Sequence, residues 1–494
     1  MLTPNMRYAE LKDSYLFNTI YRKTDEYLTA HPGKQVLRMG VGDVSLPLCD
    51  AVIKALHEAV DDQAKGSTFH GYMPEVGAPF LRKAIAGYYA GMGANVAENE
   101  IFISSGACDD LGDILELFDR DNTVMVIEPA YPEYVDTNIL GGRRIVHLTS
   151  SEENGFLPEP DETIAADILY ICSPNNPTGA VFNRLQLQAW IDFANENGAV
   201  ILFDAAYEIF VEDKDLPHSI YELDGADKCA IEICSLSKTA GFTGTRLGYT
   251  VVPSNLVRNG MSLNAMWSRN RETRTNGVSY ILQKGAAAVF TPEGQTQIHE
   301  NLRIYKKNAV YFMDALDQAG IWYCGGKNAP YIWMRCPEGM SGWEFFDYLL
   351  NEIQVVGIPG DHLCTFSLDG IRCGLVICYD IRFPELVRSL ALQGIDVLFV
   401  VSQWPKDRIR HLRSLTTARA IENQVFVVCC NSCGTAGETV YGGNSAVIEP
   451  FDEPLTLAGE TEVIVSASLD MQTLGKIRGS IPVFRDRRPE LYHI

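Results

Sequence analysis

The chain has 494 residues, with 41 Lys and Arg against 63 Asp and Glu, so its formal net charge is −22. At about 150 residues per domain, this length predicts roughly three domains with ample room for buried cores. Hydrophobic residues make up 46% and charged residues 21%, a balance that excludes an intrinsically disordered chain. The acidic charge argues against nucleic acid or an anionic membrane surface as the main partner.

Other features of composition predict a cytoplasmic protein without membrane contact. No run approaches the roughly 20 apolar residues that cross a bilayer. The start, MLTPNMRYAELKDSYLF, lacks a basic segment before an apolar core, so no secretory signal is expected. The 13 cysteines are scattered, which favours reduced thiols over a disulfide framework. The Cys430-x-x-Cys433 pair has no second pair to complete a zinc site, so no metal is expected.

Short apolar runs alternate with helical patterns from about Gly40 to Met261. The clearest strands are expected at Val124–Ile127, Ile168–Cys172, Val200–Phe203 and Ile231–Cys234. Between them, helical spacing of apolar residues predicts a helix over Leu185–Asn197, which Gly198 ends. This alternation predicts an α/β fold, with a parallel sheet covered by helices on both faces. Ligands of such sheets bind beyond the carboxyl ends of the strands.

The pattern changes at Asp361, and we place a domain boundary between Gly360 and Asp361 although no linker composition marks it. After the boundary we expect strands at Ile371–Ile377, Val397–Val401, Val425–Cys430, Ser445–Ile448 and Glu462–Ser466. We expect helices at Pro384–Leu392 and His411–Asn423.

Four polar residues follow predicted strands in the first 360 residues: Lys238, Asp204, Asn176 and Tyr131. Each alone has an ordinary explanation: a solvated charge, a helix cap, a turn or a packed ring. Together they meet the needs of pyridoxal phosphate, which requires an amine for a Schiff base, a carboxylate beside its ring nitrogen and a clamp for its phosphate.

The roles follow from this chemistry. Lys238 supplies the amine and, once displaced by substrate, shuttles the proton. Asp204 pairs with the ring nitrogen, and Asn176 and Tyr207 hydrogen-bond the ring oxygen. Tyr131 stacks on the ring face.

The phosphate clamp is expected from two segments. Ser235, Ser237 and Arg246 supply hydroxyls and a guanidinium that can bind an anion with two hydrogen bonds. The backbone of Gly106 and Ala107, at the start of a predicted helix, adds amide donors and a helix dipole.

The motifs NNPTG, DAAYE, SLSKTAGFTGTR and NAPYIW resemble those of fold type I aminotransferases, and within them the LL-diaminopimelate aminotransferase family. The resemblance runs from about Tyr8 to Gly360. It implies a mostly parallel seven-stranded sheet with helices on both faces, a small α+β domain and a homodimer with shared active sites. It also implies ping-pong transfer of an amino group between a diaminopimelate-like amino acid of lysine biosynthesis and a 2-oxo acid such as 2-oxoglutarate.

The resemblance also implies domain limits. Residues 1–39 form an N-terminal arm and part of the small domain, and residues 40–260 form the large cofactor domain. Residues 261–360 form the rest of the small domain, without its usual C-terminal end.

Several residues match substrate-contacting positions of the family, some of them contributed by the partner subunit: Tyr15, Gly42, Tyr72, Glu75 and Asn276. The family carries a Lys after the Gly106–Ala107 pair, whereas this chain has Cys108, which cannot supply a positive charge. The family's carboxylate-binding Arg would fall at Arg372. This residue either grips the substrate carboxylate or is a strand residue of the segment that follows Gly360; the second interpretation is favoured slightly.

The last 134 residues contain GIRCGLVICYDIRFPELVR, with Cys378 at a strand end before a helix start, where amide donors lower a thiol pKa. This motif resembles the carbon–nitrogen hydrolase (nitrilase) superfamily and matches Cys378 to its nucleophile. The superfamily also needs a Glu base and a Lys, which come from the first half of its fold and have no counterpart here. The segment is therefore expected to be a partial α/β domain with an uncovered apolar sheet face.

Three hypotheses remain open from the sequence. The leading one is a pyridoxal phosphate-dependent aminotransferase acting on small amino and 2-oxo acids. The second is a thiol amidase that uses Cys378. The third is a fusion whose hydrolase-like part is inactive, whether an assembly element or a product of recombination or sequence assembly.

Overall fold

The computed structural model describes residues 4–9, 11, 16–40, 42, 44–161, 163–337, 340–360, 364–368, 371–436, 439–451 and 454–488. The chain forms two compact units, Met1–Gly360 and Asp361–Ile494, and each is described by itself. Within the described ranges, no helix is both long and apolar enough to cross a membrane. The same residues contain no group of three His, Cys, Asp or Glu side chains that could hold a metal ion.

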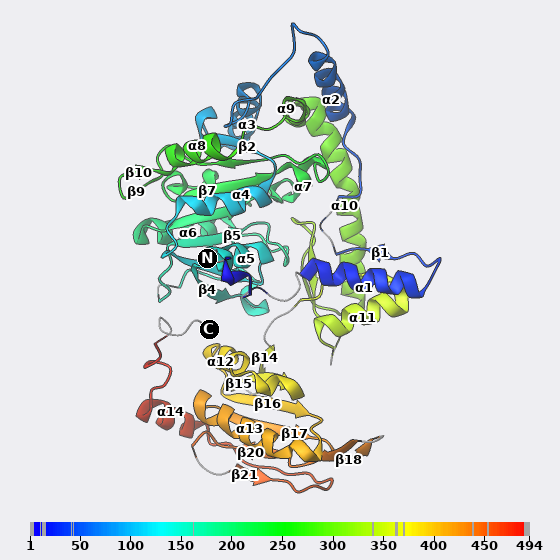
Figure 1. Ribbon diagram of the computed structural model, residues 1–494, viewed down its shortest axis with the longest axis vertical. Coiled ribbons are helices and arrows are strands. Elements are labelled where there is room, and N and C mark those ends of the chain that lie inside the picture. The colour runs from blue at the N-terminus through cyan, green and yellow to red at the C-terminus, as the bar shows by residue number, and fades with distance from the viewer. Residues whose placement is uncertain are drawn as a thin grey trace. The chain divides into compact units, whose positions relative to one another are not determined.

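A seven-stranded sheet forms the centre of the first unit, with strand order β2-β8-β7-β6-β5-β3-β4 (Figure 1). The strands are β2 (Ile101–Ser104), β3 (Thr123–Glu128), β4 (Arg144–Thr149), β5 (Ile168–Cys172), β6 (Val200–Asp204), β7 (Ala230–Ser235) and β8 (Gly248–Val251). Neighbouring strands are parallel except at β8, which runs antiparallel to β2 and β7. Every residue of β5 and β6 is buried, as in strands covered on both faces. The mostly parallel sheet expected from the sequence is confirmed.

Helices lie around this sheet, and some of them pack on one another and not directly on it (Figure 1). They are α2 (Asp50–Gln63), α3 (Pro79–Met92), α4 (Ala107–Asp113), α5 (Pro132–Gly141), α6 (Arg184–Asn197), α7 (Leu236–Ala240), α8 (Leu263–Arg274), α9 (Tyr280–Val289) and α10 (Pro292–Ala319). α6 shows why the sequence forms them: Asn183 caps its start by accepting from Gln186 N at 2.9 Å, and Gly198 ends it at φ +68°.

The main core of the first unit extends beyond residue 260. Leu263 and Trp267 of α8, Val289 of α9 and Ile298 of α10 are buried in the same cluster as the sheet. The hydrophobic core thus continues across residue 260. The domain limit expected between residues 260 and 261 stays a prediction.

A smaller α+β layer joins both ends of the first unit. Its helices are α1 (Leu16–Ala30) and α11 (Gly342–Ile353), and its strands are β1 (Leu37–Arg38), β11 (Tyr323–Gly325), β12 (Ile332–Met334) and β13 (Val355–Val356). β1 pairs in parallel with β13. A second cluster buries side chains from both ends: Ile20, Tyr27, Phe346, Leu350 and Val356. Short strands β9 (Val257–Arg258) and β10 (Met261–Ser262) form a separate hairpin.

Short 3₁₀ turns connect many of these elements. They are η1 (Met6–Ala9), η2 (Glu98–Glu100), η3 (Ile114–Leu117), η4 (Glu152–Asn154), η5 (Glu208–Phe210), η6 (Ile220–Glu222), η7 (Ala226–Lys228), η8 (Cys378–Arg382) and η9 (Lys406–Arg408).

The second unit is built on a six-stranded sheet with order β14-β15-β16-β17-β20-β21. Its strands are β14 (Cys364–Leu368), β15 (Ile371–Ile377), β16 (Val397–Ser402), β17 (Phe426–Asn431), β20 (Ala446–Ile448) and β21 (Pro454–Leu457), and β18 (Cys433–Ala436) with β19 (Thr439–Gly442) form a separate hairpin. The strand expected at Glu462–Ser466 is wrong. This segment is irregular, and Val463 and Ile464 are 54% and 97% exposed, because its alternating pattern meets no partner strand.

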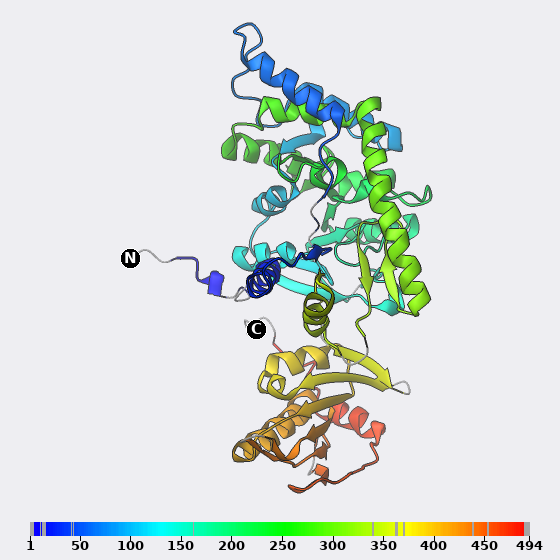
Figure 2. The same cartoon turned by 90° about the vertical axis from the view of Figure 1, so that its right-hand side faces the viewer.

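Helices lie on both faces of the second sheet (Figure 2). α12 (Pro384–Leu392) and α13 (Ile409–Asn423) pack on one face, and Leu474 of α14 (Met471–Ser480) packs on the other against Cys373, Val397 and Phe426. Towards the carboxyl ends of β15 and β16, this second face carries Ile377 and Val401, which are 56% and 51% exposed. The face that the sequence analysis expected to be uncovered is thus covered in part by α14.

Candidate active site

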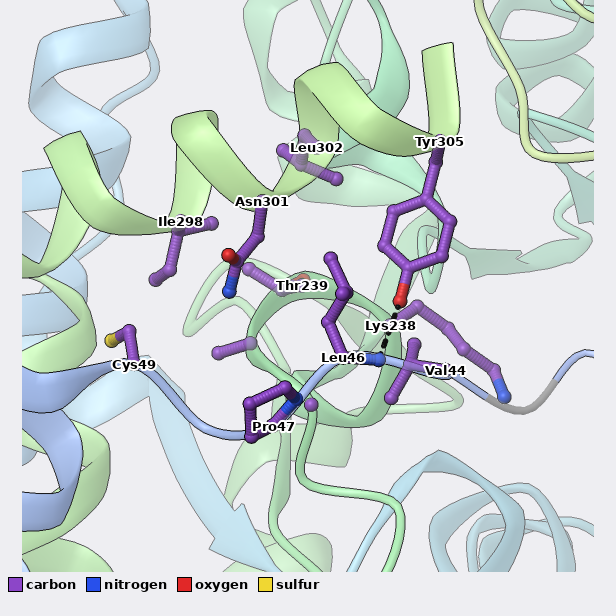
Figure 3. Close-up of a pocket in the computed structure, with 12 residues that line it drawn as sticks. Val44, Leu46, Pro47, Cys49, Lys238, Thr239, Ile298, Asn301, Leu302 and Tyr305 are labelled. Atoms are coloured by element: carbon purple, nitrogen blue, oxygen red, sulfur yellow. Dashed lines mark hydrogen bonds between the residues drawn. The ribbon is translucent and has the colours of Figure 1, made fainter. Parts of the chain in front are cut away.

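Lys238 lies in α7, the five-residue helix that directly follows β7. Its amine donates to the carbonyl oxygen of Gly42. Figure 3 shows the lysine side chain beside Val44 and Tyr305. Tyr305 Oη on α10 accepts from the backbone N–H groups of Ser45 and Leu46 at 3.0 and 3.1 Å. These two hydrogen bonds hold the segment that contains Gly42, Ser45 and Leu46 beside the lysine. A small cavity of about 20 Å³ lies between this segment, α7 and α10, and neither Asp204 nor Arg246 lines it.

Gly42 is the point at which this segment approaches the lysine most closely. A Cβ added at Gly42 would lie 2.5 Å from Tyr331 Oη and 3.8 Å from Lys238 Nζ. The amine and the hydroxyl therefore face the same α-carbon, and the first of these distances is too short for any side chain.

Three polar groups from different segments form a hydrogen-bonded row next to Gly42. Tyr331 Oη lies 2.7 Å from Tyr207 Oη, and Asn176 Nδ2 donates to Tyr207 Oη at 3.3 Å. The two phenol rings pack edge to face, with centroids 5.0 Å apart and planes at 72°. Burial raises the pKa of both phenols, so both hydroxyls keep their protons at neutral pH.

Asp204 ends β6 and is 6% exposed. It is opposite Ile233 of β7 in the sheet register, so Asp204 and the start of α7 lie at neighbouring strand ends. Tyr134 Oη donates to Asp204 Oδ2 at 2.5 Å, and Ala206 N donates to Oδ1 at 3.0 Å. Burial raises the pKa of Asp204, and these two hydrogen bonds oppose the shift.

The predicted aromatic residue Tyr131 packs against the tyrosine that donates to this carboxylate. It occupies the position just before α5, and its ring meets the ring of Tyr134 edge to face at 5.7 Å and 81°. Tyr131 is thereby held beside the residue that donates to Asp204.

Ser235, Ser237 and Arg246 form a continuous group of donors. Ser235 Oγ caps α7 by accepting from Ser237 N at 3.2 Å, and Arg246 Nη1 donates to Ser237 Oγ at 3.2 Å. Arg246 has φ +60°, a left-handed conformation that is uncommon outside glycine and concentrates at functional sites.

Two glycines without side chains allow the backbone of Gly106 and Ala107 to lie close to Arg246. A Cβ at Gly106 would lie 2.6 Å from Arg246 Nη2, and one at Gly248 would lie 2.9 Å from the Gly106 α-carbon and 3.0 Å from Ala107 N. Gly106 also has φ +144°, outside the range of ordinary side chains. The segments that begin α4 and β8 are therefore close because neither glycine carries a side chain.

The residue after Ala107 faces a carboxylate. Cys108 Sγ donates to Glu133 Oε2 and Oε1 at 2.9 and 3.1 Å. Burial and the Glu133 carboxylate raise the pKa of the Cys108 thiol to about 12, so it stays protonated. Burial also raises the pKa of Glu133. At this place the chain has the acidic side chain of Glu133, and Cys108 does not supply the positive charge of the family's Lys.

Known families cover both parts of this chain. The sequence pattern of the family "Aminotransferase class I and II" matches residues 34–372. Relatives named LL-diaminopimelate aminotransferase include one from Agathobacter rectalis, 46% identical over 373 residues, and one from Lawsonia intracellularis, 46% identical over 376 residues. Each alignment covers 73% of this chain and 92% of the relative.

The chain belongs to the class I and II aminotransferase family. The solved structure of L,L-diaminopimelate aminotransferase from Chlamydomonas reinhardtii matches with a TM-score of 0.69 at 37% identity, covering 72% of this chain and 90% of that chain. The fold type I aminotransferase fold is thus confirmed.

This aminotransferase also carries a carbon–nitrogen hydrolase segment. The pattern of the family "Carbon-nitrogen hydrolase" matches residues 285–479 and overlaps the aminotransferase match up to residue 372. The fusion expected from the sequence is confirmed.

Three other predicted substrate contacts differ in their exposure. Tyr72 is 89% exposed, Asn276 is exposed and Glu75 is half-buried, and their roles stay predictions. Tyr15 lies outside the described residues.

Two predicted residues of this aminotransferase lie in its second unit. Arg372 is an exposed residue of β15, paired with Ser367 of β14, and its role stays a prediction. Cys378 directly follows β15 at φ +47°, and its carbonyl accepts from Trp404 Nε1 at 3.4 Å. A left-handed residue between strand and helix is typical of an exposed nucleophile, but the role of Cys378 stays a prediction.

Two residues of the site, Tyr134 and Tyr331, were not predicted from the sequence. Tyr134 follows Tyr131 by three positions, and this spacing places both on one side of a helix start. Tyr331 stands in the NAPYIW motif, which carried the family resemblance but gave no role to its tyrosine.

Proposed function

We propose that this aminotransferase uses pyridoxal phosphate to move an amino group between a diaminopimelate-like amino acid and a 2-oxo acid such as 2-oxoglutarate. The observation that carries the proposal is the pair of neighbouring strand ends on β6 and β7. One bears the buried Asp204 carboxylate and the other leads to the Lys238 amine. Enzymes of the family use this cofactor, and the relatives' names give the substrate class.

The residues present fit the cofactor. Its phosphate suits the hydroxyls of Ser235 and Ser237, the Arg246 guanidinium and the glycine-lined backbone at Gly106. Its ring nitrogen suits Asp204: a buried carboxylate with a raised pKa gains most from a cationic partner, because the partner offsets the cost of burying the charge.

When bound, the cofactor withdraws electrons from the carbon that carries the amino group, which makes the hydrogen on that carbon acidic. Lys238 Nζ then accepts this proton and returns it during transfer. The Gly42 carbonyl holds the amine on this side of the site. Tyr134 and the Ala206 N–H keep Asp204 in one orientation. Asn176 and Tyr207, which are hydrogen-bonded to each other, would bind the ring oxygen.

A homodimer in the cytoplasm is the setting we propose, with some of the predicted substrate contacts contributed by the partner subunit. The Cys378 thiol has no part in this reaction. A second candidate activity, amide hydrolysis, is favoured by the carbon–nitrogen hydrolase match and by the left-handed Cys378 at its strand end.

Replacement of Lys238 by Ala tests the proposal. With pyridoxal phosphate added, the wild-type protein should show a visible absorption band and consume LL-diaminopimelate with 2-oxoglutarate. Lys238→Ala should abolish the band and lower kcat by about 10²–10⁴-fold, the contribution of a positioned proton-transfer group.

Lys284→Ala is the matched control. Lys284 packs over the Phe80 ring at 5.2 Å in the first unit, so its loss should leave the band and kcat unchanged. A Lys238→Ala protein that keeps the band would contradict the proposal. A band without turnover of LL-diaminopimelate would contradict only the substrate.

A further inference from the structure

We propose that Tyr331 is a positioning residue: its hydroxyl donates to Tyr207 and so leaves the Tyr207 proton available for the ring oxygen of the cofactor. The inference rests on the proposed function, because it concerns the cofactor proposed there. Its basis is the row formed by Tyr331, Tyr207 and Asn176.

The row is held by packing as well as by hydrogen bonds. Tyr331 directly precedes β12, and its ring meets that of Tyr207 edge to face at 5.0 Å. Gly42 lies against its hydroxyl, where a Cβ would be 2.5 Å away. The Tyr331 oxygen therefore has little freedom to leave its position 2.7 Å from Tyr207 Oη.

Counting protons gives the direction of the hydrogen bonds. A phenol oxygen carries one proton and accepts through two lone pairs, whereas an amide nitrogen only donates. Asn176 Nδ2 therefore fills one acceptor position of Tyr207. If Tyr331 donates as well, both acceptor positions are filled, and the Tyr207 proton points to a third group.

The opposite direction leaves a proton without an acceptor. If Tyr207 donated to Tyr331, the Tyr331 proton would need another partner, and in the described part of the chain the hydrogen bond of this hydroxyl is the one to Tyr207. Tyr331 is partly buried against the main core, and a donor left without a partner there is destabilising. With an anionic ring oxygen beside Tyr207, only donation from Tyr331 satisfies all three groups.

Donation from Tyr331 also strengthens Tyr207 as a donor, because hydrogen bonds in a chain polarise one another. A stronger donor stabilises negative charge on the ring oxygen and lowers the proton affinity of the nitrogen that joins the cofactor to Lys238. Loss of the Tyr331 hydroxyl should therefore raise the pH at which the visible band changes, by about half a unit to one unit.

The experiment is a pH titration of the visible band in Tyr331→Phe, Tyr207→Phe and the double variant, together with the cofactor dissociation constant of each apoprotein. Tyr331→Phe keeps the ring and its packing, and a thermal melt checks the fold. We expect both single variants to raise the midpoint, Tyr207→Phe by more. The double variant should match Tyr207→Phe alone, because Tyr331 acts through Tyr207.

Tyr323→Phe is the control. Tyr323 lies on β11 of the same hairpin and donates to Asp317 at 3.4 Å, so its loss should leave the midpoint unchanged. An unchanged midpoint in Tyr331→Phe, or a full additional shift in the double variant, overturns the inference alone. A wild-type protein with no visible band overturns the proposed function and this inference together.

Discussion

A single methyl group added at Gly42 would disturb the candidate active site. In Gly42→Ala the new carbon would lie 2.5 Å from Tyr331 Oη, while the distance to Lys238 Nζ, 3.8 Å, is an ordinary contact. Either the phenol or the whole segment must move. Since a misplacement of about 1 Å can lower a rate by 10²-fold, we expect kcat to fall by roughly tenfold or more. Steady-state kinetics and the cofactor dissociation constant measure this.

Gly87→Ala makes the same chemical change without the clash. Gly87 lies in α3, and nothing stands within 4 Å of its added Cβ. In a helix this change should be neutral or stabilise by about 0.5–1 kcal/mol. If Gly42→Ala kept both kcat and cofactor affinity, the segment that carries Gly42 would not belong to the site.

Sequence reasoning identifies site residues when chemistry singles them out. Lys238 and Asp204 stand at strand ends, where a parallel sheet gathers its ligand contacts, so spacing alone brings them together. Tyr331 and Tyr134 contribute through hydrogen bonds to Tyr207 and Asp204. These contacts form only in the folded chain and correspond to no regular spacing in the sequence. The hydrogen bond between Cys108 and Glu133 was missed for the same reason: the sequence shows the missing lysine but not the acid that faces its place.

At the scale of elements, β7 carries a buried acid as well as leading to Lys238. Glu232 is 1% exposed, and it accepts from Tyr89 of α3 at 2.5 Å, from Ser219 Oγ at 2.7 Å and from Ile220 N at 3.0 Å. Burial raises the pKa of Glu232 to about 7, and nearby Glu208 adds to the shift. The three hydrogen bonds oppose it.

This buried acid predicts a pH-dependent free energy of unfolding. The ordinary pKa of a Glu is 4.5 and the folded value is about 7. The stability that protonated Glu232 contributes is therefore complete below about pH 4.5. It falls as pH rises towards 7, because the unfolded chain releases the proton first. Urea unfolding at pH 5, 6, 7 and 8 should show wild type losing stability relative to Glu232→Gln across this range. A difference that does not change with pH would contradict the shift.

The elements were predicted best where strands are buried on both faces. The prediction for β5 has the observed limits, and those for β6 and β7 are short only at their ends, because continuous apolar runs of β-branched residues are distinctive. The strand expected at Glu462–Ser466 failed because alternation alone does not supply a partner strand. Pairing is a property of the whole sheet, which a local pattern does not contain.

At the scale of the whole molecule, two families share one chain without a linker between them. The sequence placed the change of pattern at Gly360–Asp361 from motifs, since composition there is ordinary. The participation of α8 and α9 in the main core was not visible from the sequence, because burial against a distant sheet leaves no separate local pattern. The small layer was foreseen from both flanks only through the family resemblance.

The two units have separate hydrophobic cores, and this predicts how the cofactor acts on stability. A ligand that binds only the folded form of one unit stabilises that unit by RT ln(1 + [L]/Kd), about 2.7 kcal/mol at 100-fold excess over Kd. Calorimetry should therefore show two transitions, and pyridoxal phosphate should raise the Tm of the first unit by roughly a few degrees while leaving the other unchanged. Lys238→Ala should reduce the shift, since it removes the covalent attachment. A single transition that moves as a whole would contradict independent units, and two transitions that both ignore the cofactor would contradict binding at Asp204 and Lys238.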